Sequence, residues 1–506
     1  MNKYIFFTLF LGGLLSSVSA DTTHNAASEN LNNTDFKQPW LCYTASGAEV
    51  RKKQVTEGIL PYIVFEGETQ PVSVETRMKM SKTPALSVAV IQKGQLDWSA
   101  AWGVLQEGGG AVDCASLFQA GSLAKPVTLM AALRMKTAGL VDFDQSIDTY
   151  LSSYRLPQGQ QTQADPVTLR NLLSHTAGIV RGGYAGYAQN EPIPTDEQIL
   201  RGEAPSNSRK VEVVNKPGAS LAYSGGGYTL IEVALQDKLN KPFEQIMRDW
   251  LLAPVGMKQA DFTMPLPNSR HSHTARGHQI NGSIIAGGWN NYPEQAAAGL
   301  WATATDLAMF LLEIHKGYQG KSAIFTQASI EEILANPIAN HAYGFRLVSD
   351  NNEQVFITHY GGTVGYRAGI TLNLKTGDGA VFLTNSDNGS NLGEEFLSAV
   401  SRTYEWPVFR EKRIKRVKQS AEVLQSLAGS YIFKEQDWEV LVVNQNGSLK
   451  LVFPAGNRLP LVLVPIQGRK YQFAHETGVI ANFIGEGEDL KIHLFGQTGQ
   501  RQPSIE

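Results

Sequence analysis

Cysteine is scarce in this sequence, and neither sign of charge is in large excess. The 506 residues include two cysteines, and the formal net charge is −3 at pH 7. The spacing of Cys42 and Cys114 excludes a cysteine-based metal site. The balanced charge leaves no basic field that could hold nucleic acid. We therefore expect no nucleic-acid partner.

Long apolar runs are also missing after the N-terminus. Residues 1–20 contain Lys3, an apolar run over residues 4–15 and the small-residue sequence Val18-Ser19-Ala20. This pattern predicts a signal peptide that is cleaved after Ala20 and is too short to span a bilayer. No cysteine follows the cleavage point to carry a lipid anchor, and no later segment is apolar enough to cross a membrane. We expect a periplasmic or secreted protein without a membrane span.

Both cysteines would then enter an oxidising compartment. There Cys42 and Cys114 could form one disulfide or remain as two free buried thiols. The sequence leaves both alternatives open.

The composition favours a globular chain of two or more domains, because 42% of the residues are hydrophobic and 18% are charged. Residues 21–38 are polar and are predicted to be loose. We expect the main domain at residues 39–410 and a basic linker at residues 411–424. Residues 425–506 alternate apolar and polar residues between Asn-Gly, Glu-Gly and Gln-Gly turns, which predicts an all-β domain.

Turn and capping signals place several elements of the main domain. A Lys93-Gly94 turn predicts a hairpin, and Thr303 with Asp306 predicts a helix cap. The expected strands are Ala85 to Ile91, Gln95 to Trp102, Gln354 to Thr358, Tyr366 to Leu374 and Gly379 to Leu383; the expected helices are Val167 to Leu173, Thr229 to Lys238, Leu307 to His315 and Glu394 to Tyr404.

The stretch from Gly121 to Pro126 carries the strongest chemical signal. It opens an apolar run that predicts a helix beginning near Ser122 and ending near Gly139. Residues three apart share a helix face, so the Lys125 amine can reach the Ser122 hydroxyl. The helix N-terminus adds free N–H donors beside that hydroxyl. A serine with a base and an oxyanion site is a nucleophile for acyl groups.

Other polar clusters receive structural interpretations. His175 is expected to brace a loop. His271, His273 and His278 are expected to be solvated, because no carboxylate lies near them in sequence. The acidic run over residues 142–148 lacks the glycine and glutamate that a calcium loop needs.

Three motifs together identify a family. Ser122-x-x-Lys125, Tyr223-Ser224-Gly225 and His359-Tyr360-Gly361 occur in the order found in serine β-lactamases and penicillin-binding proteins. The chain most resembles the class C β-lactamases and their esterase and D-aminopeptidase relatives, over about residues 83–404.

The resemblance implies a mixed α+β fold. It predicts an antiparallel sheet flanked by helices and an all-helical lobe inserted after the Ser122 helix, with the site between them. The C-terminal all-β domain resembles the lipocalin-like appendages of some relatives. No metal or organic cofactor is implied.

The resemblance also implies roles for the motif residues. Ser122 would be the nucleophile, and Lys125 and Tyr223 would share the general-base and general-acid work. The backbone N–H groups of Ser122 and Gly362 would form the oxyanion hole.

Two positions depart from the β-lactamase pattern: His359, which is among the predicted catalytic residues, and Gly225, which is among the predicted substrate-binding residues. His359 replaces a lysine and would polarise the site, or bind a substrate carboxylate when protonated. Gly225 replaces an asparagine whose amide binds the substrate's amide. Tyr360 and Gly361 complete the predicted substrate-binding set.

Two further matches to class A motifs are interpreted as turns. Lys375-Thr376-Gly377 and Ser386-Asp387-Asn388 lie in reversed order and only a few residues apart. The first also lies between two alternating strands, where it reads as a hairpin turn.

The leading hypothesis is an exported serine hydrolase that forms an acyl-enzyme on ester or amide substrates and has weak β-lactamase activity. The substrate would be a small or peptide-like molecule, including one derived from the cell wall. One alternative is a penicillin-recognising or cell-wall-binding protein that acylates and stalls, and another is a true class C-like β-lactamase. The sequence leaves the oligomeric state open.

Overall fold

The computed structural model describes residues 42–503, except residues 68, 181, 336, 351–353, 435–437, 455–459 and 474–478. The predicted signal peptide and the loose segment 21–38 lie outside the described residues. Within those residues, no helix is long and apolar enough to cross a membrane. The chain divides into two compact units, of which one comprises Leu60–Pro71 with Arg410–Glu506, and the other holds Val72–Phe409 and the segment ending at Ile59.

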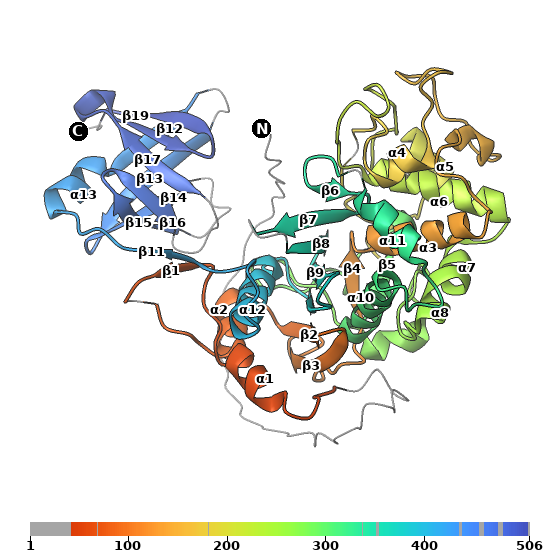
Figure 1. Cartoon of the computed structure of the whole chain (residues 1–506). Helices are drawn as coiled ribbons and strands as arrows, with labels where there is room; N and C mark the ends of the chain where they lie inside the picture. The colour runs from red at the N-terminus through yellow and green to blue at the C-terminus, as the bar shows by residue number, and fades with distance from the viewer. Residues whose placement is uncertain are drawn as a thin grey trace. The chain divides into compact units, whose positions relative to one another are not determined.

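The larger unit is built on an antiparallel sheet of seven strands in the order β3-β2-β10-β9-β8-β7-β6 (Figure 1). The strands are β2 (Ala85–Gln92), β3 (Gln95–Gly103), β6 (His341–Ala342), β7 (Phe345–Ser349), β8 (Val355–Thr363), β9 (Tyr366–Asn373) and β10 (Gly379–Thr384). The three predicted strands of the 354–383 region correspond to β8, β9 and β10.

Local turn chemistry sets the register of this sheet. Lys93 and Gly94 both have positive φ, of 50° and 74°, which closes the predicted hairpin between β2 and β3. The Lys375-Thr376-Gly377 turn joins β9 to β10 at the same end of the sheet, where the Gly94 N–H donates to the Gly377 carbonyl at 2.9 Å. The prediction that this triplet is a hairpin turn is confirmed.

Helices cover both faces of the sheet. One face packs against α10 and the other against α12, α1 and α2. The bounds are α1 (Glu49–Thr56), α2 (Val74–Ser81), α10 (Ala304–Tyr318), α11 (Gln327–Leu334) and α12 (Gly389–Thr403). The predicted cap of α10 is a capping box in which Thr303 and Asp306 each accept the other's backbone N–H. This arrangement confirms the predicted α+β class.

A helical lobe follows the first strand pair, as the resemblance implied. Its elements are α3 (Ala124–Thr137), α4 (Leu169–Leu173), α5 (Asp196–Arg201), α6 (Gly225–Leu239), α7 (Phe243–Met247), α8 (Ala253–Val255) and α9 (Gln295–Ala298); a two-stranded sheet of β4 (Phe118–Gly121) and β5 (Leu300–Ala302) lies beside it. Helix α3 is buried along most of its length, which is why its sequence is apolar.

The smaller unit contains a closed antiparallel barrel of eight strands. They are β12 (Gly429–Phe433), β13 (Trp438–Gln445), β14 (Ser448–Val452), β15 (Leu461–Gln467), β16 (Lys470–Phe473), β17 (Ile480–Ile484), β18 (Lys491–Leu494) and β19 (Gln497–Arg501), preceded by α13 (Ala421–Leu427). Buried side chains such as Tyr431, Tyr471 and Phe483 form its core.

A second, smaller sheet in this unit joins distant parts of the chain. Strand β1 (Ile63–Phe65) pairs in parallel with β11 (Lys412–Ile414), and Ile63 and Phe65 pack against Val464 of the barrel. Strand β1 lies in the segment Leu60–Pro71, which we call the excursion. The residues on either side of the excursion lie next to each other, because Ile59 and Val72 exchange backbone hydrogen bonds of 3.0 and 2.9 Å.

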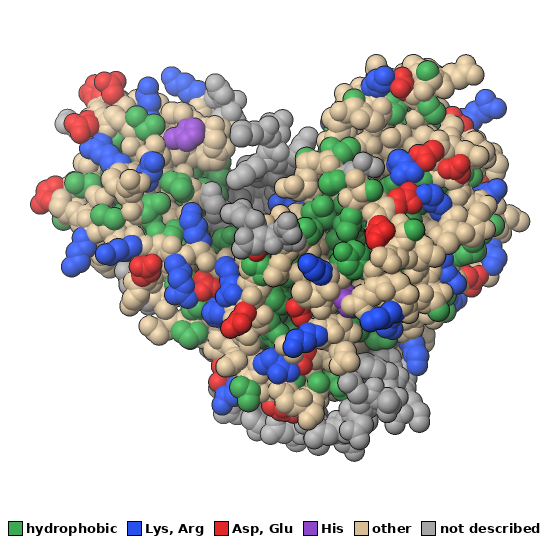
Figure 2. All heavy atoms as spheres, viewed as in Figure 1, with side chains coloured by type: hydrophobic (Ala, Val, Ile, Leu, Met, Phe, Trp, Pro, Cys, Tyr) green, Lys and Arg blue, Asp and Glu red, His purple; other side chains and the backbone are tan. Residues whose placement is uncertain are grey.

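The structure answers the question that the sequence left open about the two cysteines. Cys42 and Cys114 form a disulfide, the first of the two alternatives. Figure 2 shows basic and acidic side chains interspersed over the face drawn.

Candidate active site

Ser122 lies between the end of β4 and the start of α3, and Lys125 reaches back to it. The Lys125 Nζ is 3.0 Å from the Ser122 Oγ and 2.7 Å from the Ala297 carbonyl oxygen of α9. The lysine side chain is buried, so these two oxygens hold its amine in place. The structure thus brings together the first pair that the sequence predicted.

Tyr223 approaches the same amine from the helical lobe. The Lys125 Nζ lies 4.9 Å from the Tyr223 ring centroid and 5.7 Å from that of Tyr228. Tyr223 directly precedes Ser224, whose Oγ caps α6 by accepting the Gly227 N–H at 3.0 Å. Helix α6 therefore begins at Gly225, earlier than predicted, and its capped end fixes the backbone beside Tyr223.

The His175 ring packs against Tyr223 and the backbone that follows it. Its Nδ1 accepts the Ser224 N–H at 3.1 Å, and its ring centroid is 4.5 Å from that of Tyr223. The residue is buried with a positive φ of 59°. Burial lowers the pKa of His175 well below its usual value, with a smaller contribution from Lys125. The loop-bracing interpretation is confirmed, and the ring also packs against Tyr228, with 5.2 Å between the ring centroids.

His359 lies on β8 across from Tyr223, with 6.2 Å between the two ring centroids. Burial lowers the pKa of His359 to about 3, and the nearby Lys125 amine adds to the shift. The imidazole is therefore neutral at neutral pH. Of the two roles expected for His359, carboxylate binding by a protonated ring does not fit this environment, whereas polarisation of the site does.

The glycines after His359 allow β8 to lie against β4. A Cβ at Gly361 would lie 1.9 Å from the Ala120 carbonyl oxygen, and a Cβ at Gly121 would lie 2.7 Å from the Gly362 nitrogen. The Gly362 amide is thus packed against the residue that precedes Ser122. The side chain of Tyr360 points to the opposite face of the sheet, where its ring centroid is 6.2 Å from that of Phe382.

Gly225 is covered by the backbone of a neighbouring loop. Its N–H donates to the Gly182 carbonyl at 2.8 Å, and a Cβ at this position would lie 2.4 Å from that oxygen. The Tyr184 ring also closes on it, at 3.0 Å from the same Cβ position. A side chain such as asparagine has no room here while this loop is in place.

Two loops that flank the site are joined to each other. Tyr187 and Asn291 exchange backbone hydrogen bonds of 2.8 and 2.7 Å. The Tyr292 hydroxyl donates to the Ala185 carbonyl at 3.2 Å and accepts the Val364 N–H at 3.0 Å. Sequence reasoning missed Tyr292, because its partners lie far away in the chain.

Glu232 is a second residue that sequence reasoning missed. It is buried in α6, and its Oε2 accepts the Ala296 N–H at 2.8 Å. Burial raises the pKa of Glu232 well above its usual value, and the nearby carboxyl of Asp196 adds to the shift. One signal was present in the sequence, since Glu232 is the acidic residue in the otherwise apolar stretch from Leu230 to Leu235.

The three histidines that were expected to be solvated do not behave alike. His273 is exposed, and the His271 ring contacts Trp289 with 4.8 Å between the centroids. His278 is fully buried, and its Nδ1 lies 3.0 Å from the Asn385 carbonyl oxygen. The prediction was wrong for His278 because the loop folds back onto the end of β10.

Ser386-Asp387-Asn388 is a turn, as predicted. Asp387 accepts the Gly365 N–H at 3.0 Å and pairs with Arg367, also at 3.0 Å. Arg367 further donates to the Thr363 and Tyr366 carbonyls at 2.8 and 2.6 Å. Arg367 pairs with Gly362 in the register of β8 and β9, and these contacts occupy its guanidinium.

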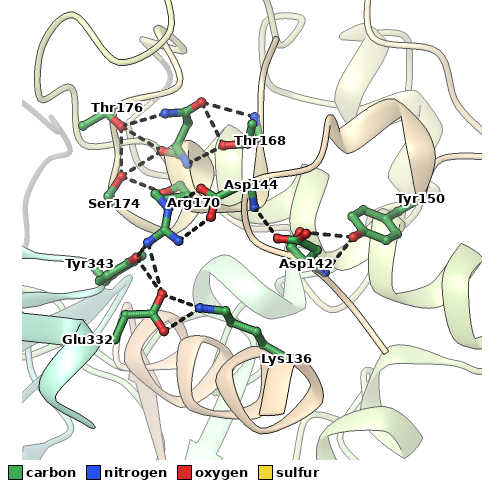
Figure 3. A network of polar contacts seen from close by, with 11 residues as sticks. Lys136, Asp142, Asp144, Tyr150, Thr168, Arg170, Ser174, Thr176, Glu332 and Tyr343 are labelled. Atoms are coloured by element: carbon green, nitrogen blue, oxygen red, sulfur yellow. Dashed lines mark hydrogen bonds and ion pairs between the residues drawn. The ribbon is translucent and has the colours of Figure 1, made fainter. Parts of the chain in front are cut away.

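A polar network ties the helical lobe to the sheet-bearing part of this unit (Figure 3). Arg170 of α4 pairs with Asp144 at 2.7 Å and with Glu332 of α11 at 3.1 Å, and it also contacts the Tyr343 hydroxyl. Lys136 at the end of α3 donates to Glu332 at 2.6 Å. The acidic run near residue 144 thus contributes to an ion-pair network.

Comparisons with known proteins place the chain in a family. A sequence model described as Beta-lactamase matches residues 73–399, so the chain belongs to the Beta-lactamase family. It is 26% identical over 245 residues to a β-lactamase of Providencia stuartii, covering 47% of this chain and 57% of that one. It is 28% identical over 157 residues to the D-alanyl-D-alanine-carboxypeptidase/endopeptidase AmpH of Escherichia coli strain K12, covering 30% and 38%.

A solved structure supports the fold. The octameric penicillin-binding protein homologue from Pyrococcus abyssi superposes with a TM-score of 0.57 at 17% identity, covering 84% of this chain and 98% of that one. The matched regions span only part of the length of the two curated relatives.

Proposed function

We propose that the protein is a serine hydrolase that forms an acyl-enzyme on Ser122. The observation that carries this proposal is the 3.0 Å contact between the Ser122 Oγ and the buried Lys125 Nζ at the start of α3. Relatives named as a β-lactamase and a D-alanyl-D-alanine-carboxypeptidase/endopeptidase support cleavage of acyl bonds.

In the proposed mechanism the Ser122 hydroxyl loses its proton to the pair of Lys125 and Tyr223 as its oxygen attacks the substrate carbonyl. The backbone N–H groups of Ser122 and Gly362 stabilise the negative charge on the carbonyl oxygen. The bond to the leaving alcohol or amine breaks, and the same pair returns the proton to it. Water then attacks the ester on Ser122 and releases the acid and the free serine.

The surroundings favour neutral ester or amide substrates over β-lactams. His359 is neutral, and Arg367 is paired with Asp387, so neither supplies a free cation for a substrate carboxylate. The Gly225 N–H is already donated to Gly182. We therefore propose esterase or D-peptidase activity on small or peptide-like substrates, with weak β-lactamase activity.

Parallel assays with p-nitrophenyl esters, D-alanyl p-nitroanilide and nitrocefin test this proposal. We expect steady release from the ester or the anilide, slow nitrocefin turnover, and loss of all three in Ser122→Ala. The exposed Ser390→Ala serves as the control and should match the unmodified chain. Fluorophosphonate labelling followed by mass spectrometry should find the adduct on Ser122, and an adduct on another serine would refute the mechanism.

A second candidate is a penicillin-recognising protein that is acylated and stalls. This candidate is favoured by the close approach of the Gly182 carbonyl to Gly225. The approach restricts the space beside an acyl group on Ser122. A burst of p-nitrophenol equal to the enzyme concentration, followed by no further release, would support this candidate.

We also propose that the chain is exported. The disulfide between Cys42 and Cys114 supports an oxidising compartment. N-terminal sequencing of the protein from the cells that produce it should begin at Asp21, and a chain that retains residues 1–20 would contradict export by cleavage.

A further inference from the structure

Helix α6 buries an acidic side chain, Glu232, near the carboxyl groups of Asp196 and Glu294. Glu232 is 1% exposed and lies between Ile231 and Val233, which are also buried. Removing a carboxyl group from water costs free energy unless its oxygens find hydrogen bonds. The hydrogen bonds that the Glu232 carboxyl accepts must therefore offset the cost of its burial.

Its oxygen holds the first turn of α9. The Ala296 N–H donates to the Glu232 Oε2 at 2.8 Å, and both groups are buried. Helix α9 has four residues, and Glu294 at its N-cap makes no side-chain capping bond. Because the first N–H groups of a helix have no partner within it, Glu232 provides the Ala296 N–H with an acceptor from another helix.

The next residue of that turn contacts the lysine of the site. The Ala297 carbonyl accepts from the Lys125 Nζ at 2.7 Å, and this amine lies 3.0 Å from the Ser122 Oγ. Three hydrogen bonds and the backbone of Ala296 and Ala297 thus connect Glu232 of α6 to the Ser122 hydroxyl. The same helix begins at Gly225, two residues after Tyr223, so it lies next to both partners of the serine in this chain of contacts.

We propose that Glu232 is a positioning residue for Lys125, an inference that rests on the proposed function. Its hydrogen bond fixes the α9 turn, which aims the Ala297 carbonyl and so places the Lys125 amine at Ser122. Both the protonated and the ionised carboxyl can accept the Ala296 N–H, so the effect does not require Glu232 to titrate. A displacement of about 1 Å at such a site lowers a rate by about 100-fold.

The test compares three substitutions of Glu232 in the full chain with p-nitrophenyl acetate as substrate. Glu232→Gln keeps an oxygen that can accept the Ala296 N–H, and we expect kcat within about three-fold of the unmodified enzyme. Glu232→Met removes the acceptor at similar volume, and Glu232→Asp shortens its reach. Both should lower kcat and the rate of fluorophosphonate labelling by about 10- to 100-fold with KM nearly unchanged.

A matched control separates positioning from lost stability. Glu395 of α12 is also buried, and α12 covers the face of the sheet opposite to α10. The Glu395 carboxylate pairs with Arg77 of α2 at 2.5 Å. Glu395→Met should lower the melting temperature and leave kcat of the folded enzyme unchanged. The Glu232→Asp variant keeps the test open if Glu232→Met does not fold.

Two outcomes would overturn the proposal. One is a folded Glu232→Met or Glu232→Asp enzyme with unchanged kcat, and the other is a Glu232→Gln enzyme as slow as Glu232→Met. Failure of the proposed function looks different, because the unmodified chain would then release no p-nitrophenol or would carry the fluorophosphonate on another residue.

Discussion

Lys125 is held by oxygens on two sides, and this sets what can replace it. Its amine contacts the Ser122 Oγ and the Ala297 carbonyl within a buried space. Lys125→Met removes the amine at similar volume, so we expect ester hydrolysis and covalent labelling to fall by at least about 100-fold. Lys125→Arg should not restore activity, because a guanidinium keeps its proton and needs more room.

Labelling rates with a fluorophosphonate measure this prediction. Far-ultraviolet circular dichroism shows whether the variants are folded. Rapid labelling of Ser122 in a folded Lys125→Met chain would contradict the assigned role.

His359 gives a pH prediction with a definite sign. The pKa of His359 is about 3 in the folded chain and near 6.5 when unfolded, so between these values the unfolded state binds the extra proton. The free energy of unfolding should therefore rise with pH from about 3 to 6.5, and His359→Gln should lose this increment. Urea unfolding at several pH values measures the difference.

The same pKa predicts that titration of His359 causes no change in kcat/KM between pH 5 and 9. Profiles of kcat/KM for the ester should be parallel in the unmodified enzyme and His359→Gln. A limb near pH 6.5 that is present in the first and missing in the second would show that the imidazole titrates there.

Sequence reasoning predicted Lys125 beside Ser122 from helix spacing, and it found Tyr223 through the order of three motifs along the chain. It missed Glu232 and Tyr292 because their partners, Ala296 and Val364, come from other parts of the chain. His278 was misplaced for the same reason, since its loop becomes buried only against Asn385.

At the scale of elements, the capping box of α10 provides a second pH prediction. Burial raises the pKa of Asp306 from 3.8 to about 6, although hydrogen bonds from Gln259 and Thr303 oppose the shift. The folded state therefore binds this proton more tightly than the unfolded state. Stability should fall as pH rises from about 4 to 6, by up to about 3 kcal/mol.

Asp306→Asn keeps an acceptor for the cap and cannot ionise. The free energy of unfolding of Asp306→Asn should not decrease between pH 4 and 6 as that of the unmodified chain does. The stability of the variant relative to the unmodified chain should therefore be higher at pH 7 than at pH 4.5. Guanidinium titrations at pH 4.5 and 7 compare the two. A difference that is the same at both pH values would contradict the raised pKa.

Elements with strong local signals were predicted well. The Lys93-Gly94 turn and the Thr303 cap both depend on neighbours within a few residues. Helix α6 was predicted to start at Thr229 but begins at Gly225, although its three leading glycines disfavour a helix. The Ser224 cap and the packing around Gly225 outweigh that preference.

At the scale of the whole molecule, the excursion over Leu60–Pro71 makes removal of the barrel costly. A chain ending at residue 409 leaves Ile63 and Phe65 without β11 and Val464. We expect this truncated chain to bind more 8-anilinonaphthalene-1-sulfonate and to aggregate. Replacing residues 60–71 as well by Asn-Gly should restore a soluble product, because Ile59 and Val72 already form an antiparallel bridge that a two-residue turn can close.

The full-length chain with the same Asn-Gly replacement is the control for loss of β1 alone. Size-exclusion chromatography measures the soluble fraction of each protein. Equal solubility of the two truncated chains would contradict this account. No local pattern predicts the pairing of β1 with β11, since about 350 residues separate the two strands and only folding brings them together.

The path of the chain also bears on how such a protein can diversify. Within the described residues the chain passes between the two units three times, at residues 59–60, 71–72 and 409–410. A genetic recombination event near residue 410 would import a new barrel while keeping the old β1, so the parental and incoming strands would have to match. Exchange of the barrel as a cassette therefore requires two separated segments of the gene to be inherited together.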